Sequence, residues 1–241
     1  MKYFIFILVV KIVHMHHKEK RMNIQIKSKQ RVADHGEVNT NLREINAMLD
    51  LVKNETLRIE SKFLEPACGD GNFIIEVLRR KVQVIKDKYS KSQFDFEKSL
   101  FIATASVYGI ELLEDNVLSC RKRLLDFLET EYKNSFKKTF IDKFIKSLEF
   151  VLSKNILLGD ALTLKTYEED LMGLPIIFSD WSMISSGMVK RKDFVYSDLI
   201  DKSSHKEMPL FSDLNDSDKA FIPDPIKDYP LINYMDVINH E

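Results

Sequence analysis

Cysteine and long apolar runs are both scarce in this chain of 241 residues. The two cysteines, Cys68 and Cys120, stand in unrelated contexts without metal-ligand spacing, which argues against a disulfide framework and against a zinc site. The sequence contains no internal repeat. Because 44% of its residues are apolar, the chain can bury a real core, and we expect one domain with extensions in a reducing, cytoplasmic setting.

Residues 1–29 are predicted to be a leader that does not belong to the domain. Their apolar run, residues 3–10, is too short to span a bilayer, and no small-residue cleavage site follows it. We expect translation to start at Met15 or Met22, or the leader to be disordered or bound to a partner. No membrane association is expected.

The net charge is −1, but the charges are unevenly distributed. Residues 198–241 hold ten acids and four bases, which leaves 32 bases and 27 acids in the preceding part. A mildly basic body could meet the phosphates of a nucleic acid, although ordinary solvated charge accounts for the same composition. The polar residues and prolines of 201–241 predict an acidic, extended or partly disordered tail.

Short apolar runs alternate with helical periodicity across residues 30–200, which is typical of an α/β domain. The predicted fold is a Rossmann-like, doubly wound, mostly parallel sheet with helices on both faces, incomplete at its C-terminus. Past residue 181 the pattern weakens, and residues 190–200 suggest a small hairpin or helix. Helices are predicted over residues 42–53, 74–89, 115–132 and 137–152, and strands at 63–64, near 111, at 155–160 and at 175–179.

Acidic residues mark the ends of four predicted strands, at Glu65, Glu111, Asp160 and Asp180. In an open parallel sheet the ligand lies at these carboxyl ends. Carboxylates accept hydrogen bonds from hydroxyl, ammonium and amine groups, whereas a phosphate ligand would be repelled. The loop CGDGN also lacks the three-glycine fingerprint of dinucleotide-binding proteins. An isolated acid after a strand has an ordinary alternative role as a helix cap or turn residue.

The segment EPACGDGNF resembles the first motif of the N6-adenine DNA methyltransferases of restriction-modification systems. Family members usually read PACGSG or PACGTG at its centre. The resemblance implies that the segment cradles the methionine part of S-adenosylmethionine, and that its cysteine is a packing residue rather than a nucleophile. The implied cofactor-binding residues are Glu65, Pro66, Ala67, Cys68, Gly69, Asp70, Gly71 and Phe73.

Three further segments resemble neighbouring motifs of the same family. YGIEL resembles the second motif, so that Glu111 would accept the ribose hydroxyls and Leu112 would flank the adenine. GDAL resembles the third motif, so that Asp160 would accept from the adenine amine with Ala161 beside it. GEVNT partly resembles the segment before the first motif, where Thr40 would help to hold the cofactor carboxylate. An asparagine on each side of that threonine stands where the family has an aromatic residue and a proline.

The catalytic motif of the family, (Asn/Asp/Ser)-Pro-Pro-aromatic, is degenerate here. The corresponding residues read FSDW and contain no proline. By the resemblance, Ser179, Asp180 and Trp181 would hold and stack the flipped adenine. Without prolines the carbonyl that faces the target amine is not fixed, and methyl transfer depends on that alignment. The alternative is a strand terminator followed by a core tryptophan.

Three functions are compatible with these motifs. The first is an adenine-specific DNA methyltransferase, or a methylation subunit of a restriction-modification system, whose sequence recognition comes from a partner subunit. The second is a catalytically inactive homologue that binds S-adenosylmethionine and regulates or scaffolds a neighbour. The third is a methyltransferase for RNA, protein or a small molecule. The basic run KRK at 190–192 slightly favours a nucleic acid over a protein or a small molecule as the substrate. The family mechanism is a direct transfer that needs no metal.

Overall fold

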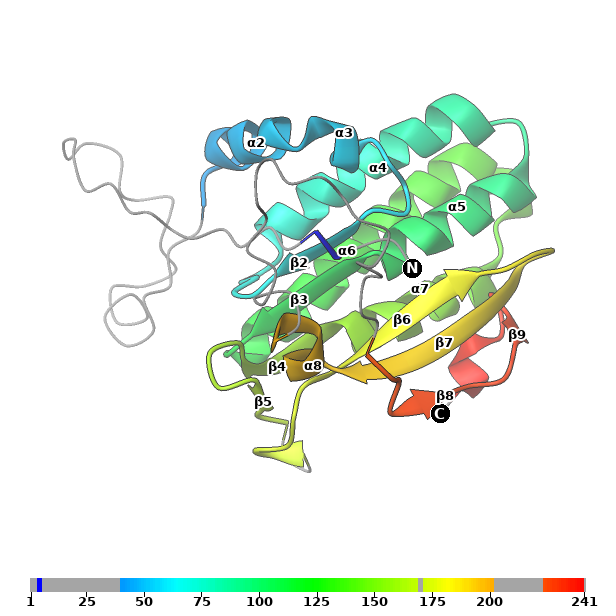
Figure 1. Ribbon diagram of the computed structural model, residues 1–241. Coiled ribbons are helices and arrows are strands. Elements are labelled where there is room, and N and C mark those ends of the chain that lie inside the picture. The colour runs from blue at the N-terminus through cyan, green and yellow to red at the C-terminus, as the bar shows by residue number, and fades with distance from the viewer. Residues whose placement is uncertain (1–3, 6–39, 169–170, 202–222, 241) are drawn as a thin grey trace, which may run out of the picture.

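The computed structural model describes residues 4–5, 40–168, 171–201 and 223–240 (Figure 1). The predicted start codons Met15 and Met22, and most of the predicted leader, lie outside the described residues. Within these ranges no helix is both long and apolar enough to cross a membrane.

A mixed, mostly parallel sheet of five strands lies at the centre of the α/β fold, in the order β1-β2-β3-β4-β5. The first four strands are parallel to their neighbours, and β5 is antiparallel to β4. The predicted strands near residues 63, 111 and 156–160 are confirmed. The bounds are β1 Phe4–Ile5, β2 Lys62–Glu65, β3 Val107–Glu111, β4 Ile156–Asp160 and β5 Lys165–Thr166.

Helices connect the parallel strands and cover one face of the sheet (Figure 1). Because the chain moves in one direction from β2 to β3 to β4, right-handed crossovers place all of the connecting helices on the same face. Phe63, Val107 and Ile156 point from the strands into a core that these helices complete. The bounds are α2 Leu42–Leu51, α3 Lys53–Thr56, α4 Asn72–Tyr89, α5 Gln93–Ala105, α6 Glu114–Phe136, the 3-10 turn η1 Lys137–Thr139 and α7 Asp142–Asn155.

The opposite face of the sheet differs from the prediction, because a second sheet covers it where further long helices were expected. Tyr108 and Ile110 pack there against Ile176, Phe178 and Tyr196. Among the described residues, the helix that contributes to this cluster is short, so the expected doubly wound arrangement with helices on both faces is not confirmed. This second layer consists of β6 Ile177–Met183, β7 Met188–Val195 and α8 Tyr196–Asp201, of which β6 and β7 form an antiparallel hairpin.

The fourth parallel strand predicted at residues 175–179 is likewise corrected, since β6 occupies part of that range but pairs antiparallel with β7. The reason lies in the preceding turn. The chain reverses from β4 into β5, and Ile176 then packs against Gly159 at the carboxyl end of β4. From this point β6 runs toward the amino ends of the parallel strands, where Asp180 meets Lys62 at the start of β2.

Part of the predicted tail belongs to the folded domain. Residues 223–240 add β8 Lys227–Asp228 and β9 Ile232–Asn233 to β7, and end in a 3-10 turn, η3 Val237–Asn239. Tyr234 is buried in the main core, and its hydroxyl donates a hydrogen bond of 2.7 Å to Glu97 Oε2. The domain boundary expected near residue 200 therefore does not separate this segment from the core.

Candidate functional site

The glycine loop between β2 and α4 has the strand, loop and helix arrangement that the sequence predicts. Gly69 and Gly71 have positive φ angles of 53° and 88°, and the Gly71 N–H donates to the Cys68 carbonyl at 2.9 Å. A Cβ on Gly71 would lie 2.7 Å from Cys120 Sγ, so the loop passes very close to α6. A Cβ on Gly69, by contrast, would have no atom of a non-neighbouring residue within 4 Å, which leaves the backbone open to a ligand.

Glu111 connects the end of β3 to this loop. Its Oε2 accepts a hydrogen bond of 2.8 Å from the Gly69 N–H, and its Oε1 accepts from the Leu113 N–H at 3.1 Å and from Asn116 Nδ2 at 3.4 Å. The side chain is buried, yet an ionised carboxylate has about four lone-pair sites and can accept from a ligand as well. The structure thus brings together the first and second predicted motifs.

The third predicted motif follows β4, the next strand of the sheet. Asp160 Oδ1 accepts a hydrogen bond of 2.8 Å from the Leu162 N–H, which makes it a turn residue in this state. Ala161 is half-buried, whereas Leu112 is 47% exposed and Leu162 is 93% exposed. Neighbouring parallel strands lie about 4.8 Å apart, so the ends of β2, β3 and β4 form one continuous edge with apolar side chains beside the carboxylates.

A cavity of about 880 Å³ opens beside the glycine loop and brings Thr40 to the same space as Asp70. Its volume lies within the usual range of small-molecule sites. Glu111 and Asp160 do not line it. The lining residues come from the amino end of α2, the glycine loop, the first half of α4 and the middle of α6: Thr40, Asn41, Leu42, Ile45, Asn46, Asp70, Asn72, Ile75, Glu76, Arg79 and Arg123.

Arg123 is a contact of the loop that the sequence reasoning missed. From α6, its Nη1 donates to the Asp70 carbonyl at 2.6 Å and lies 2.9 Å from Asp70 Oδ2, while Nη2 donates to Asn72 Oδ1 at 3.1 Å. A signal was available, because Arg123 follows the buried Cys120 by one helical turn and therefore lies near the face that meets the loop.

The remaining residues of the first motif differ in how far they are buried. Cys68 is buried, and its hydrogen bond with Cys120 together with burial raises the pKa of its thiol, which disfavours the reactive thiolate. Phe73 is buried in the core on α4. Pro66 is half-buried, and Ala67 is exposed. Glu65, the last residue of β2, is half-buried, as are Gly69 and Asp70, whereas Gly71 is buried.

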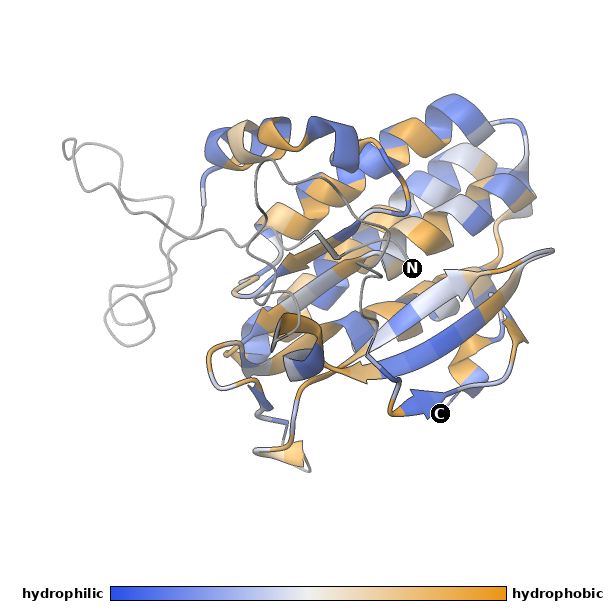
Figure 2. Ribbon diagram, in the orientation of Figure 1, coloured by the Kyte–Doolittle hydropathy of each residue, from blue (hydrophilic) through white to orange (hydrophobic). Residues whose placement is uncertain are grey.

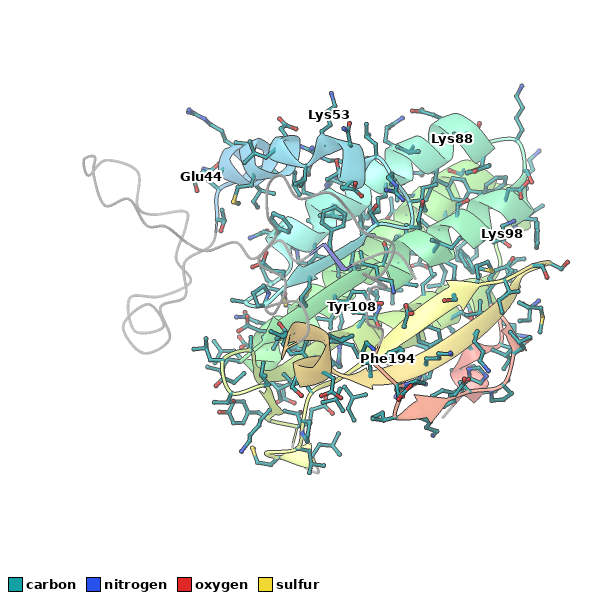
Figure 3. All side chains as sticks on the ribbon, viewed as in Figure 1. Glu44, Lys53, Lys88, Lys98, Tyr108 and Phe194 are labelled. Atoms are coloured by element: carbon teal, nitrogen blue, oxygen red, sulfur yellow. The ribbon has the colours of Figure 1, made fainter. Side chains whose placement is uncertain are left out.

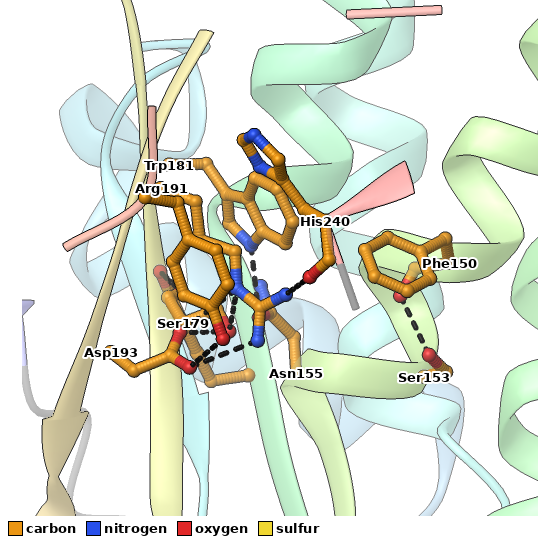
Figure 4. Close-up of polar contacts among 10 residues, drawn as sticks. Phe150, Ser153, Asn155, Ser179, Trp181, Arg191, Asp193 and His240 are labelled. Atoms are coloured by element: carbon orange, nitrogen blue, oxygen red, sulfur yellow. Dashed lines mark hydrogen bonds and ion pairs between the residues drawn. The ribbon is translucent and has the colours of Figure 1, made fainter. Parts of the chain in front are cut away.

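Trp181 is a core residue at the far end of the sheet (Figure 4). Its ring meets Phe101 and Phe150 edge to face, with centroid separations of 6.1 and 6.2 Å. Its Nε1 donates to Asn155 Oδ1 at 3.3 Å, and Asn155 directly precedes β4. The indole is therefore held at the amino end of that strand.

Ser179 and Asp180 are also engaged in buried contacts. The Ser179 hydroxyl donates to Asp193 Oδ1 at 2.8 Å, within a cluster in which Arg191 makes a bidentate ion pair to the same carboxylate (Figure 4). Figure 2 shows the middle of β7, which carries that pair, as hydrophilic. Asp180 makes an ion pair with Lys62, the first residue of β2.

These anchors separate the three predicted catalytic residues from the glycine loop. The loop follows the carboxyl end of β2, whereas the partners of Asp180 and Trp181 lie at the amino ends of β2 and β4. A strand of four or five residues spans roughly 13–17 Å at about 3.3 Å per residue. The direct transfer expected from the resemblance needs reacting atoms about 3–3.5 Å apart, and this conformation does not bring the three residues that close to the glycine loop.

The described segments contain no group of three or more His, Cys, Asp or Glu side chains that could hold a metal ion. Comparison of the chain with protein-family models, with curated proteins and with solved structures finds no match.

Proposed function

We propose that this chain binds S-adenosylmethionine and provides the cofactor-binding part of an adenine-specific DNA methyltransferase. The observation that carries the proposal is the hydrogen bond between the Gly69 N–H and Glu111. It joins two segments that resemble consecutive motifs of one family, at the carboxyl ends of adjacent parallel strands, where α/β sheets bind their ligands.

The residues at this edge fit the parts of that cofactor in order along a Rossmann-like arrangement. Thr40 and Asp70, which share the cavity, would hold the methionine part. Glu111 at the end of β3 would accept the ribose hydroxyls. Asp160 at the end of β4 would accept from the adenine amine, with the exposed Leu112 against the ring. When bound, the cofactor supplies a methyl group activated by a sulfonium, and the chain's own residues orient it.

The position of the degenerate catalytic motif supports a proposal in which this chain binds the cofactor and a partner subunit binds the target adenine. Because Trp181 and Asp180 are anchored at the opposite edge of the sheet, the groups that hold the flipped adenine would come from a partner subunit. The same partner would supply recognition of the DNA sequence. A mildly basic body is compatible with contact to DNA phosphates.

One observation favours a second function, a cofactor-binding homologue without methyl transfer. Trp181 is 8% exposed and packs against two phenylalanines, so stacking on a base would require removal of the indole from the core. Such a subunit would bind S-adenosylmethionine and regulate or scaffold a neighbouring enzyme.

The test is a calorimetric titration of the full chain with S-adenosylmethionine, followed by transfer of labelled methyl to adenine-containing DNA in the same preparation. Binding with transfer supports the first function. Binding without transfer, also after addition of proteins encoded beside the chain, supports the second. Absence of binding refutes both.

A further inference from the structure

The charged side chains around the cavity balance one another. Two acids, Asp70 and Glu76, and two bases, Arg79 and Arg123, line it. A cavity for a phosphate group would usually carry excess positive charge. A balanced set of this kind suits a ligand part that carries one positive and one negative charge.

Only one of these ion pairs reaches the glycine loop. Glu76 and Arg79 both belong to α4, with 3.8 Å between Glu76 Oε2 and Arg79 Nε. Arg123 crosses instead from α6 to Asp70, which is 53 residues away in the sequence. Asp70 also stands where the resembling family has serine or threonine.

Both partners have unused hydrogen-bonding capacity. The three contacts of Arg123 use Nη1 and Nη2, and a guanidinium has five N–H donors. Asp70 Oδ2 is paired, whereas Asp70 Oδ1 is buried and accepts no hydrogen bond from any described residue. The Asp70 side chain is 20% exposed, and this exposure does not come from Oδ1. Oδ2 has one ion-pair partner, and a carboxylate oxygen has a second lone pair that can accept from a ligand.

We infer that the Asp70–Arg123 pair recognises the amino-acid head group of the cofactor. Arg123 binds the α-carboxylate, Asp70 Oδ2 accepts from the α-ammonium, and Thr40 lies in the same cavity as a further donor. This inference rests on the proposed function and adds to it a residue that distinguishes S-adenosyl amino acids from other adenosine compounds. A guanidinium suits the task because its planar fork matches a carboxylate.

The experiment compares two ligands that differ in the head group. S-adenosylhomocysteine carries the ammonium and the carboxylate, whereas 5′-methylthioadenosine lacks both, and the sulfur is uncharged in each. Calorimetric titration of the full chain gives the ratio of the two dissociation constants. In Arg123→Gln we expect about 10- to 100-fold weaker binding of S-adenosylhomocysteine, as for loss of a charge-assisted hydrogen bond, and an unchanged affinity for 5′-methylthioadenosine.

Two further variants serve as comparisons. Lys122→Gln removes the same charge from the neighbouring position of α6, where the side chain is 75% exposed, and should leave both affinities within about twofold. Arg123→Lys keeps the charge without the fork and should give an intermediate loss. The thermal unfolding midpoint of each variant shows whether it folds.

The outcomes separate this inference from the proposed function. If Arg123 only stabilises the conformation of the loop, Arg123→Gln weakens the binding of both ligands by the same factor. That result leaves the proposal of cofactor binding in place but overturns the inference. Unchanged affinities in a folded Arg123→Gln protein overturn it as well. If the unaltered chain binds neither ligand, the proposed function itself fails.

Discussion

The backbone N–H of Gly69 and the Oε2 atom of Glu111 form a hydrogen bond of 2.8 Å between the glycine loop and the end of β3. Replacement of Glu111 by Gln removes the charge and one of the two equivalent acceptor oxygens. We expect the affinity for S-adenosylhomocysteine to fall by about 1.5–3 kcal/mol, the usual range for a hydrogen bond to a charged group. Isothermal calorimetry measures this difference.

Glu114→Gln is the matched control for that substitution. Glu114 is exposed in the first turn of α6, three residues further along the chain, and its loss should leave the affinity unchanged. Equal affinities for the unaltered chain and Glu111→Gln would remove the ribose-binding role of Glu111.

Gly71→Ala tests the close approach of the loop to α6. An alanine would adopt a φ of 88°, at roughly 1–2 kcal/mol, and its Cβ would lie 2.7 Å from Cys120 Sγ. Urea unfolding should therefore show a loss of stability, and cofactor binding should weaken because the loop shifts. Cys120→Ala removes the sulfur atom that the new Cβ would meet. In that background, Gly71→Ala should therefore lower the free energy of unfolding by less than it does in the unaltered chain. An equal loss of stability in the two backgrounds would contradict the close contact between position 71 and Cys120.

Trp181→Ala distinguishes a core residue from a base-stacking residue. The buried indole contacts two phenylalanines, so its removal should cost about 3–5 kcal/mol in the free energy of unfolding. Leu162→Ala, at a position 93% exposed, should change it by less than about 0.5 kcal/mol. Full stability of Trp181→Ala together with lost methyl transfer would instead support a catalytic role.

The buried amine of Lys81 predicts a pH dependence of stability. Its Nζ donates to the Ser61 carbonyl and to Ser106 Oγ inside the protein. Burial lowers the pKa of this amine from 10.5 to about 7, although the negative charges of Glu60 and Glu55 act in the opposite direction. Between these two pH values the unfolded chain binds the proton and the folded chain does not. Stability therefore rises with pH across this window, by at most about 1.4 kcal/mol per pH unit.

Lys81→Met isolates this contribution. The difference in unfolding free energy between the unaltered chain and Lys81→Met should increase in favour of the unaltered chain as the pH rises from about 7.5 to about 9.5. Lys88→Met, at an exposed position near the end of the same helix, should give a constant difference (Figure 3). A constant difference for Lys81→Met as well would show that its amine stays protonated in the folded state.

The local elements of the fold were predictable from the sequence because their signals are local. The glycine loop, the helix over residues 42–51 and the strands near residues 63, 111 and 156–160 occur where periodicity places them. The burial of Cys68 is also as expected. The loop, the helix and the strands depend on the spacing of apolar residues and on the backbone freedom of glycine, which are visible in a short window. The packing role of Cys68 was implied by the family resemblance instead.

The direction of β6 was not predictable in the same way. Residues 175–179 read as a strand, but a short apolar run carries no information about its pairing partner. The turn through β5 and the anchors Lys62 and Asn155 determine that β6 runs toward the amino ends of the parallel strands. Similarly, the contact between Arg123 and Asp70 depends on the docking of α6 against the loop, which is a tertiary feature.

The most direct test of cofactor binding is a calorimetric titration of the full chain with S-adenosylhomocysteine, with NAD and ATP titrated in parallel. Carboxylates at the ends of β2, β3 and β4 predict binding of S-adenosylhomocysteine and rejection of both phosphate-bearing ligands. Binding of NAD or ATP without binding of S-adenosylhomocysteine would contradict the proposed site.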